Sequence, residues 1–189
     1  MKLRSNKGFT LIEVIVVAAI IAILAGILVP MIFNQIDESK TARAQADVKS
    51  LAMAIQMLRK DTGKFPTLDK ITATDTVTIL YVPDGNAGIP NLAAGWSKAK
   101  ENNITDHLRD NSGAYSNWKG PYLPQLSVDP WNNAYVINAD AFRSPGSAVW
   151  VLSGGPNGKI DTPAAATTIN TDAVGNLIAD ADDIGIRLQ

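Results

Sequence analysis

The chain begins with one long apolar run. Residues 9–33 are almost entirely apolar, and Glu13 is the one ionisable residue among them. The uncharged part, residues 14–33, is 20 residues long, and as a helix it would span roughly 30 Å, the thickness of a bilayer's hydrocarbon core. Because a helix satisfies its own backbone hydrogen bonds in lipid, this run predicts a membrane-spanning helix.

The next segment predicts that the same helix continues with one buried face. Charged residues appear from Asp37 onwards, yet apolar residues recur at offsets of 3, 7 and 10 as Val48, Leu51, Ile55 and Leu58. These offsets place the four side chains on one helical face. Such a face needs a folded partner, so the amphipathic half is expected to pack on a domain.

Gly63 gives the expected end of this helix, because glycine suits the left-handed C-cap. We therefore predict one helix from about Thr10 to Lys60. The expected organisation is a membrane and assembly helix at residues 9–33 and its amphipathic second half at residues 34–63, followed by a globular domain.

The globular domain, residues 64–189, shows strand patterns separated by turns. The β-branched alternation of residues 76–82 predicts a strand, as do the apolar segments 135–137 and 149–152. A short helix is expected within residues 93–108. The predicted fold class is α+β, with a long N-terminal helix packed on a small antiparallel β-sheet domain.

Composition removes several classes of function. The chain has 17 Lys and Arg, 18 Asp and Glu, and no Cys. The balance argues against a nucleic-acid surface, and the absence of Cys excludes disulfides, a thiol nucleophile and Cys-ligated zinc. The single histidine, His107, is expected to be solvated because its neighbours are polar. No catalytic set emerges, so we do not expect an enzyme.

The first eight residues form a basic tip. They contain Lys2, Arg4 and Lys7 and no acidic residue, which predicts a cytoplasmic N-terminus with the rest of the chain translocated. A cleaved secretory signal would have a shorter apolar region followed by a small-residue cleavage site. A plain membrane anchor fits the length and the charge but leaves Glu13 unexplained.

Two interpretations of Glu13 remain open, and both can hold. Thr10 and Glu13 have the spacing of a capping box, so the carboxylate would bond back to the start of the helix. Alternatively, cleavage after Gly8 would create an amino group on Phe9. That amine, on the same or a neighbouring subunit, would neutralise Glu13 inside an apolar bundle.

The sequence Lys-Gly-Phe-Thr-Leu-Ile-Glu, residues 7–13, resembles the processing motif of type IV pilins and type II secretion pseudopilins. The resemblance implies that a prepilin peptidase removes a cytoplasmic leader, residues 1–8, by cutting after Gly8. It also implies methylation of the new amine of Phe9 and a role for Glu13 in assembly.

A second motif narrows the resemblance. Asp-Pro-Trp-Asn-Asn-Ala-Tyr, residues 129–135, is similar to the Asp-Pro-Trp-Gly-Asn-x-Tyr signature of the major pseudopilin, with Asn132 in place of glycine. Asn tolerates a positive φ, so the turn is expected to survive. Many type IV pilins close their C-terminal loop with a Cys pair, which is absent here. A type IV pilin of a surface filament for adhesion, motility or DNA uptake remains the alternative.

The resemblance to the major pseudopilin also implies partners and a location. The expected partners are further copies in a homopolymer, the prepilin peptidase, minor pseudopilins, the inner-membrane secretion platform, and membrane lipid before assembly; nucleic acid is not among them. The expected location is the inner membrane, spanned once, with the globular domain in the periplasm.

Two C-terminal loops contain oxygen-bearing residues of the kind that Ca²⁺ prefers. The first, residues 153–161, is rich in glycine, and the second, residues 180–185, has three Asp in four positions. Those carboxylates repel one another unless a cation or solvent neutralises them. A solvated acidic tail is one interpretation. The resemblance favours a structural calcium site, with the ligands Asn157, Asp180, Asp182 and Asp183.

Overall fold

The computed structural model describes residues 8–69, 74, 76–82 and 88–189. These residues divide into two compact units, Met1–Ser39 and Lys40–Gln189. The predicted leader lies outside the described residues, apart from Gly8.

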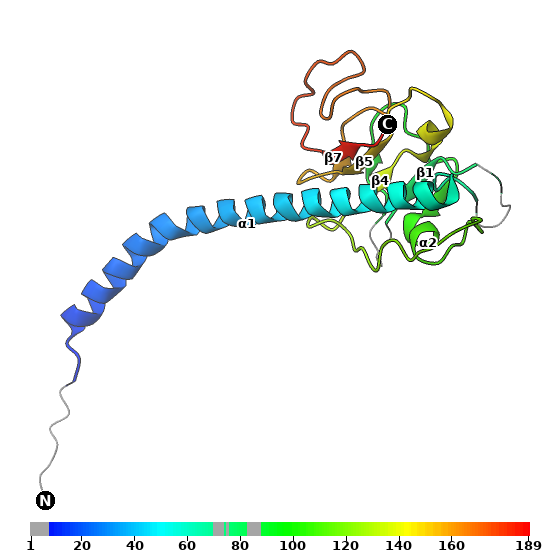
Figure 1. Ribbon diagram of the computed structural model, residues 1–189. Helices are drawn as coiled ribbons and strands as arrows, with labels where there is room; N and C mark the ends of the chain where they lie inside the picture. The colour runs from blue at the N-terminus through cyan, green and yellow to red at the C-terminus, as the bar shows by residue number, and fades with distance from the viewer. Residues whose placement is uncertain (1–7, 70–73, 75, 83–87) are drawn as a thin grey trace, which may run out of the picture. The chain divides into compact units, whose positions relative to one another are not determined.

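Helix α1 runs through Leu11–Thr62 and contains Pro30 (Figure 1). It ends where the sequence predicts. Gly63 has a φ of 72°, and its backbone N–H donates to the carbonyl oxygen of Arg59 at 2.8 Å. Glu13 in the first turn and Arg59 and Lys60 in the last turn have the charges that favour the helix dipole.

In the first unit, the side chains of α1 are exposed on all sides. Leu11 is 77% exposed and Ile27 is 68% exposed. Among the described residues, α1 is the one helix long and apolar enough to cross a membrane. An all-round apolar helix is stable only in lipid or among other apolar helices.

The second unit contains a five-stranded sheet in the order β3-β1-β4-β5-β7. Its strands are β1 (Ile79–Tyr81), β3 (Glu101–Asn103), β4 (Val136–Ile137), β5 (Trp150–Ser153) and β7 (Ile184–Arg187). Two further strands, β2 (Asn91–Leu92) and β6 (Lys159–Ile160), form a separate parallel pair. The predicted strands at residues 76–82, 135–137 and 149–152 correspond to β1, β4 and β5.

The α+β prediction is confirmed, although the sheet is mixed and not purely antiparallel. β1 pairs with β4 in the antiparallel sense but with β3 in the parallel sense. Parallel neighbours need a crossover of about a dozen residues or more, and residues 82–100 provide that length. The long middle segment therefore adds an edge strand to the sheet.

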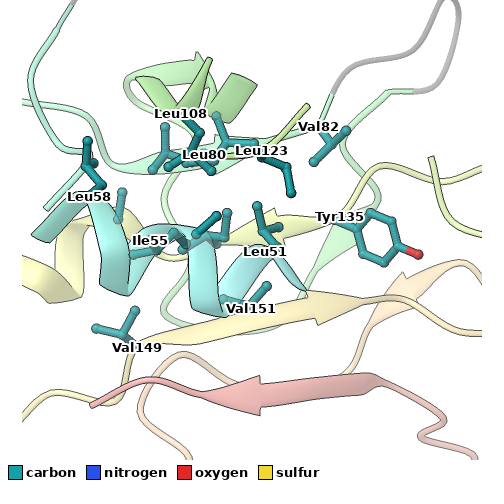
Figure 2. Close-up of a cluster of buried hydrophobic side chains, with 14 of the residues drawn as sticks. Leu51, Ile55, Leu58, Leu80, Val82, Leu108, Leu123, Tyr135, Val149 and Val151 are labelled. Atoms are coloured by element: carbon teal, nitrogen blue, oxygen red, sulfur yellow. The ribbon is translucent and has the colours of Figure 1, made fainter. Parts of the chain in front are cut away.

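The second half of α1 packs against the sheet, as its apolar spacing predicts. Leu51, Ile55 and Leu58 are fully buried. Figure 2 shows them beside Leu80 of β1 and Val151 of β5. The helix α2 (Ile104–Leu108) and the 3₁₀ helix η1 (Ala139–Arg143) also contribute buried side chains to this core.

The prediction of a solvated His107 was wrong. His107 lies in α2 with 0% exposure, and its Nδ1 is 2.8 Å from the hydroxyl oxygen of Tyr115. α2 is only five residues long, and its core-facing side consists of Ile104, His107 and Leu108. The spacing of these three residues on one helical face buries the imidazole, whatever the polarity of its sequence neighbours.

Candidate sites for processing, assembly and metal binding

The predicted cleavage site precedes the first turn of α1. Gly8 and Phe9 are exposed and lie outside the helix. A Cβ added at Gly8 would have nothing within 4 Å. The fold of the single chain therefore does not require glycine at this position. A requirement by the processing enzyme stays a prediction.

Thr10 and Glu13 form a capping box. The backbone N–H and the hydroxyl of Thr10 both donate to Oε2 of Glu13 at 2.7 Å, and the Glu13 N–H donates to the Thr10 hydroxyl oxygen at 3.4 Å. The capping interpretation of Glu13 is therefore satisfied geometrically. Pairing of Glu13 with a new amine on Phe9 concerns the cleaved protein and stays a prediction.

The two C-terminal loops meet at Asn157. Its backbone N–H donates to Oδ2 of Asp182 at 3.0 Å, and its side-chain amide donates to the carbonyl oxygen of Asp180 at 3.3 Å. Three of the four predicted metal-ligand residues are thus neighbours. Gly155, with a φ of 56°, permits this approach, because a Cβ there would overlap the carbonyl oxygen of Asp182.

Asp183, the fourth predicted ligand, is only 4% exposed. Its Oδ2 accepts hydrogen bonds from the backbone N–H groups of Asp161 at 3.0 Å and Thr162 at 2.7 Å. Burial raises the pKa of Asp183 to about 6, and the nearby Asp161 carboxylate acts in the same direction. Burial also raises the pKa of Asp182.

Two carboxylate oxygens in these loops are buried without a hydrogen-bond donor. In the part of the chain that the structure describes, they are Oδ1 of Asp182 and Oδ1 of Asp183. A buried carboxylate oxygen without a donor costs free energy unless a cation or a proton compensates it. The donor-free oxygens thus have the chemistry that a hard cation requires.

Asp180 contributes its backbone to this arrangement. It is exposed, with a φ of 60°, and its carbonyl oxygen is the group that contacts Asn157. Across the described ranges, no group of three or more His, Asp or Glu side chains could by itself hold a metal ion. A metal here would use the carboxylates of Asp182 and Asp183 together with backbone carbonyl oxygens.

Two residues that sequence reasoning did not single out organise these loops. The Asp161 carboxylate accepts from the side-chain amide of Asn157 at 2.7 Å. Asn170 donates to the carbonyl oxygen of Asp183 at 3.2 Å and accepts from the Asp183 N–H at 3.0 Å. Asp161 lies four residues after Asn157 in the same loop, so the sequence could have indicated that the two side chains are neighbours. Asn170 is distant from both loops in sequence, and no pattern along the chain indicated its role.

Comparison with known proteins agrees with the two motifs. A model of the prokaryotic N-terminal methylation motif matches residues 3–29, and a model of type II secretion system (T2SS) protein G matches residues 94–172. The chain is 30% identical over 161 residues to type II secretion system core protein G of Dickeya chrysanthemi, covering 84% of this chain and 83% of that protein.

Other relatives are similar over a comparable length. The core protein G of Pseudomonas aeruginosa is 29% identical over 164 residues, covering 87% of this chain and 95% of that protein. That of Escherichia coli is 28% identical over 159 residues, covering 83% and 86%. No solved structure matches the chain. From the N-terminal motif, the fold and these relatives together, we conclude that the chain belongs to the type II secretion system protein G family, the major pseudopilins.

Proposed function

We propose that this protein is the structural subunit of a type II secretion pseudopilus, polymerised through its N-terminal helix to drive protein export. The observation that carries the proposal is the exposed, apolar first half of the helix Leu11–Thr62 in a chain of this family. Its first half buries nothing in a single chain. Burial of that surface, at about 25 cal/mol per Å², favours lipid before assembly and neighbouring helices afterwards.

The subunit is membrane-associated before assembly, and its orientation follows from its charges. Lys2, Arg4 and Lys7 keep the N-terminus in the cytoplasm, so the globular unit lies in the periplasm. The prepilin peptidase cuts after Gly8, and Phe9 becomes the methylated N-terminus. In the filament, the amine of Phe9 neutralises Glu13 within the apolar helix bundle.

The proposed partners are other copies of the chain, the minor pseudopilins and the inner-membrane secretion platform. The family consists of structural subunits, and we propose a structural role for this chain. A surface type IV pilin is the second candidate, although the chain has no Cys to close its C-terminal loop.

We also propose a structural calcium ion between the two C-terminal loops. The support is the pair of buried, donor-free oxygens on Asp182 and Asp183, together with Asn157, which contacts both Asp182 and the backbone of Asp180. These four residues would hold the ion. It would supply positive charge that neutralises the buried carboxylates, so that binding stabilises the folded subunit by mass action.

An in-frame deletion with complementation tests the proposed function. The extracellular proteome and electron micrographs of the cell surface are compared with those of the parent strain. Loss of specific exported proteins with unchanged surface fibres is the expected result. Normal export with missing surface fibres would overturn the proposal and identify a type IV pilin.

A further inference from the structure

The globular unit exposes large hydrophobic side chains at only two places among its described residues. Within Lys40–Gln189, the exposed large hydrophobic residues are Met53, Met57, Val174, Leu177 and Ile186. Three of them border one groove, and the other two lie on one hairpin. Exposed apolar groups gathered in this way indicate surfaces that become covered.

The groove lies between α1 and the edge strand β7, which run side by side in Figure 1. Its volume is about 500 Å³, and its apolar floor consists of Met53, Met57, Ile186 and Leu188. Lys49 and Lys60 also line it and provide positive charge. Flexible methionine side chains adapt to an inserted apolar group.

The hairpin comprises residues 171–177 and exposes 86% of both Val174 and Leu177. Asp172 orders its turn: one carboxylate oxygen accepts from the backbone N–H groups of Val174 and Asn176, both at 2.9 Å. The other accepts from the Asn176 side chain at 2.8 Å. These bonds lower the pKa of Asp172, so the hairpin presents a negative charge beside its apolar tip.

Building on the proposed function, we propose that the 171–177 hairpin of one subunit inserts Leu177 and Val174 into the Met53–Met57 groove of another copy. The carboxylate of Asp172 then meets the ammonium groups that line the groove. Within one chain Leu177 and Met57 are both exposed, so a hairpin does not fill its own groove. A contact between two different patches can repeat from copy to copy, and it builds an open helical filament where the rotation between copies does not close a ring.

The charges at the groove also favour the hairpin over the apolar helix of a neighbouring subunit as the group that fills it. Residues 14–33 are uncharged, so packing them on the groove would desolvate Lys49 and Lys60 without giving them an anion. The hairpin offers apolar area together with a carboxylate. A second copy of the globular unit is therefore the better match.

Cysteine cross-linking in the assembled filament tests the contact, and the chain has no Cys of its own. Full-length Met57→Cys and Leu177→Cys subunits are co-expressed and oxidised after assembly. A disulfide-linked dimer is expected for this pair and not for Met57→Cys with Ser144→Cys, an exposed position elsewhere. Filaments without the dimer would overturn the contact while leaving the proposed function standing.

Two further results separate the alternatives. A dimer between Met57→Cys and Ile27→Cys in place of the expected one would place a neighbour's apolar helix in the groove and overturn the proposal. Absence of wild-type filaments would overturn the proposed function and this contact with it.

If cysteine substitution blocks assembly, a second pair of variants tests the contact between the hairpin and the groove. Leu177→Met keeps the apolar contact, and Leu177→Ser removes it. We expect Leu177→Ser to lower filament yield about tenfold relative to Leu177→Met at equal subunit abundance, as fits the loss of one buried leucine. Equal assembly by both variants would overturn the contact.

Discussion

At the scale of single residues, the chain places its most unusual groups at its two ends. Glu13 is bonded to Thr10 at the start of α1, and Asp183 is buried between two C-terminal loops. Both are carboxylates that could each pair with a positively charged group that the described residues of the single chain do not provide. The proposed partners are an amine at the N-terminus and a calcium ion at the C-terminal end.

The fold of the single chain does not require glycine at position 8, because nothing lies within 4 Å of an added Cβ, and we propose that processing requires it. We expect Gly8→Leu to insert in the membrane and accumulate as the full-length precursor. Immunoblotting of the membrane fraction for the two sizes measures this. Gly26→Ala, another glycine with open space around it, serves as the control and should be processed normally. Mature-sized Gly8→Leu would contradict the predicted cleavage site.

Glu13→Gln separates the two roles of this side chain, because Gln also completes a capping box but carries no charge. We expect Glu13→Gln to insert and be cleaved normally, yet to yield far fewer filaments, as Glu13→Ala should also do. Sheared filaments are quantified against total subunit. Normal assembly of Glu13→Gln with failure of Glu13→Ala would show that capping is the function of Glu13.

Asp183→Asn tests the calcium proposal in residues 40–189. Millimolar Ca²⁺ should raise the melting temperature of the parent and leave that of Asp183→Asn unchanged. At 100 times Kd, binding adds about 2.7 kcal/mol to the free energy of unfolding. Without calcium the variant should be no less stable, because the substitution removes a buried charge whose Oδ1 has no hydrogen-bond donor. Differential scanning calorimetry with and without chelator measures both effects.

Asp110 is exposed, so Asp110→Asn is the control for this experiment. Calcium should still raise the melting temperature of this variant. A parent protein whose melting temperature ignores millimolar calcium would contradict the proposal.

At the scale of elements, α1 was predictable because helix formation is local. The offsets of Val48, Leu51, Ile55 and Leu58 identify the buried face, and Gly63 identifies the end. The strands β4 and β5 were predictable from short apolar segments. The parallel pairing of β1 with β3 was not, because it joins residues about 20 positions apart across a segment without clear periodicity.

Substitutions on the two faces of α1 should differ sharply. Leu51→Ala is expected to lower the free energy of unfolding of residues 40–189 by about 2–5 kcal/mol, because it leaves a cavity in the core. Met53→Ala, on the groove face, should change it by only about 0.5 kcal/mol. Urea denaturation followed by circular dichroism measures both. Similar losses for the two variants would contradict the assignment of the buried face.

At the scale of the whole molecule, the chain combines an apolar helix with a folded unit that has its own core. We propose that the helix provides membrane insertion and polymerisation and that the folded unit forms the surface of the filament. In this proposal the basic tip decides on which side of the membrane the folded unit lies.

Reversing that tip should reverse the orientation of part of the population. In Lys2→Glu/Arg4→Glu/Lys7→Glu, we expect a substantial cytoplasmic fraction of the folded unit, because the positive charges that hold the N-terminus inside are gone. A C-terminal reporter enzyme that is active only outside the cytoplasm measures this fraction. Unchanged reporter activity would contradict the charge-based orientation.

The sequence by itself determined the long helix, its ends, the N-terminal motif and the α+β class, because each depends on local spacing or on a short motif. Tertiary structure alone decided the burial of His107, the hydrogen bonds between Asn170 and Asp183 and the donor-free oxygens of Asp182 and Asp183. It also assembled the Met53–Met57 groove from α1 and β7, elements more than a hundred residues apart. Such features arise from contacts between distant segments, and no periodicity along the chain records them.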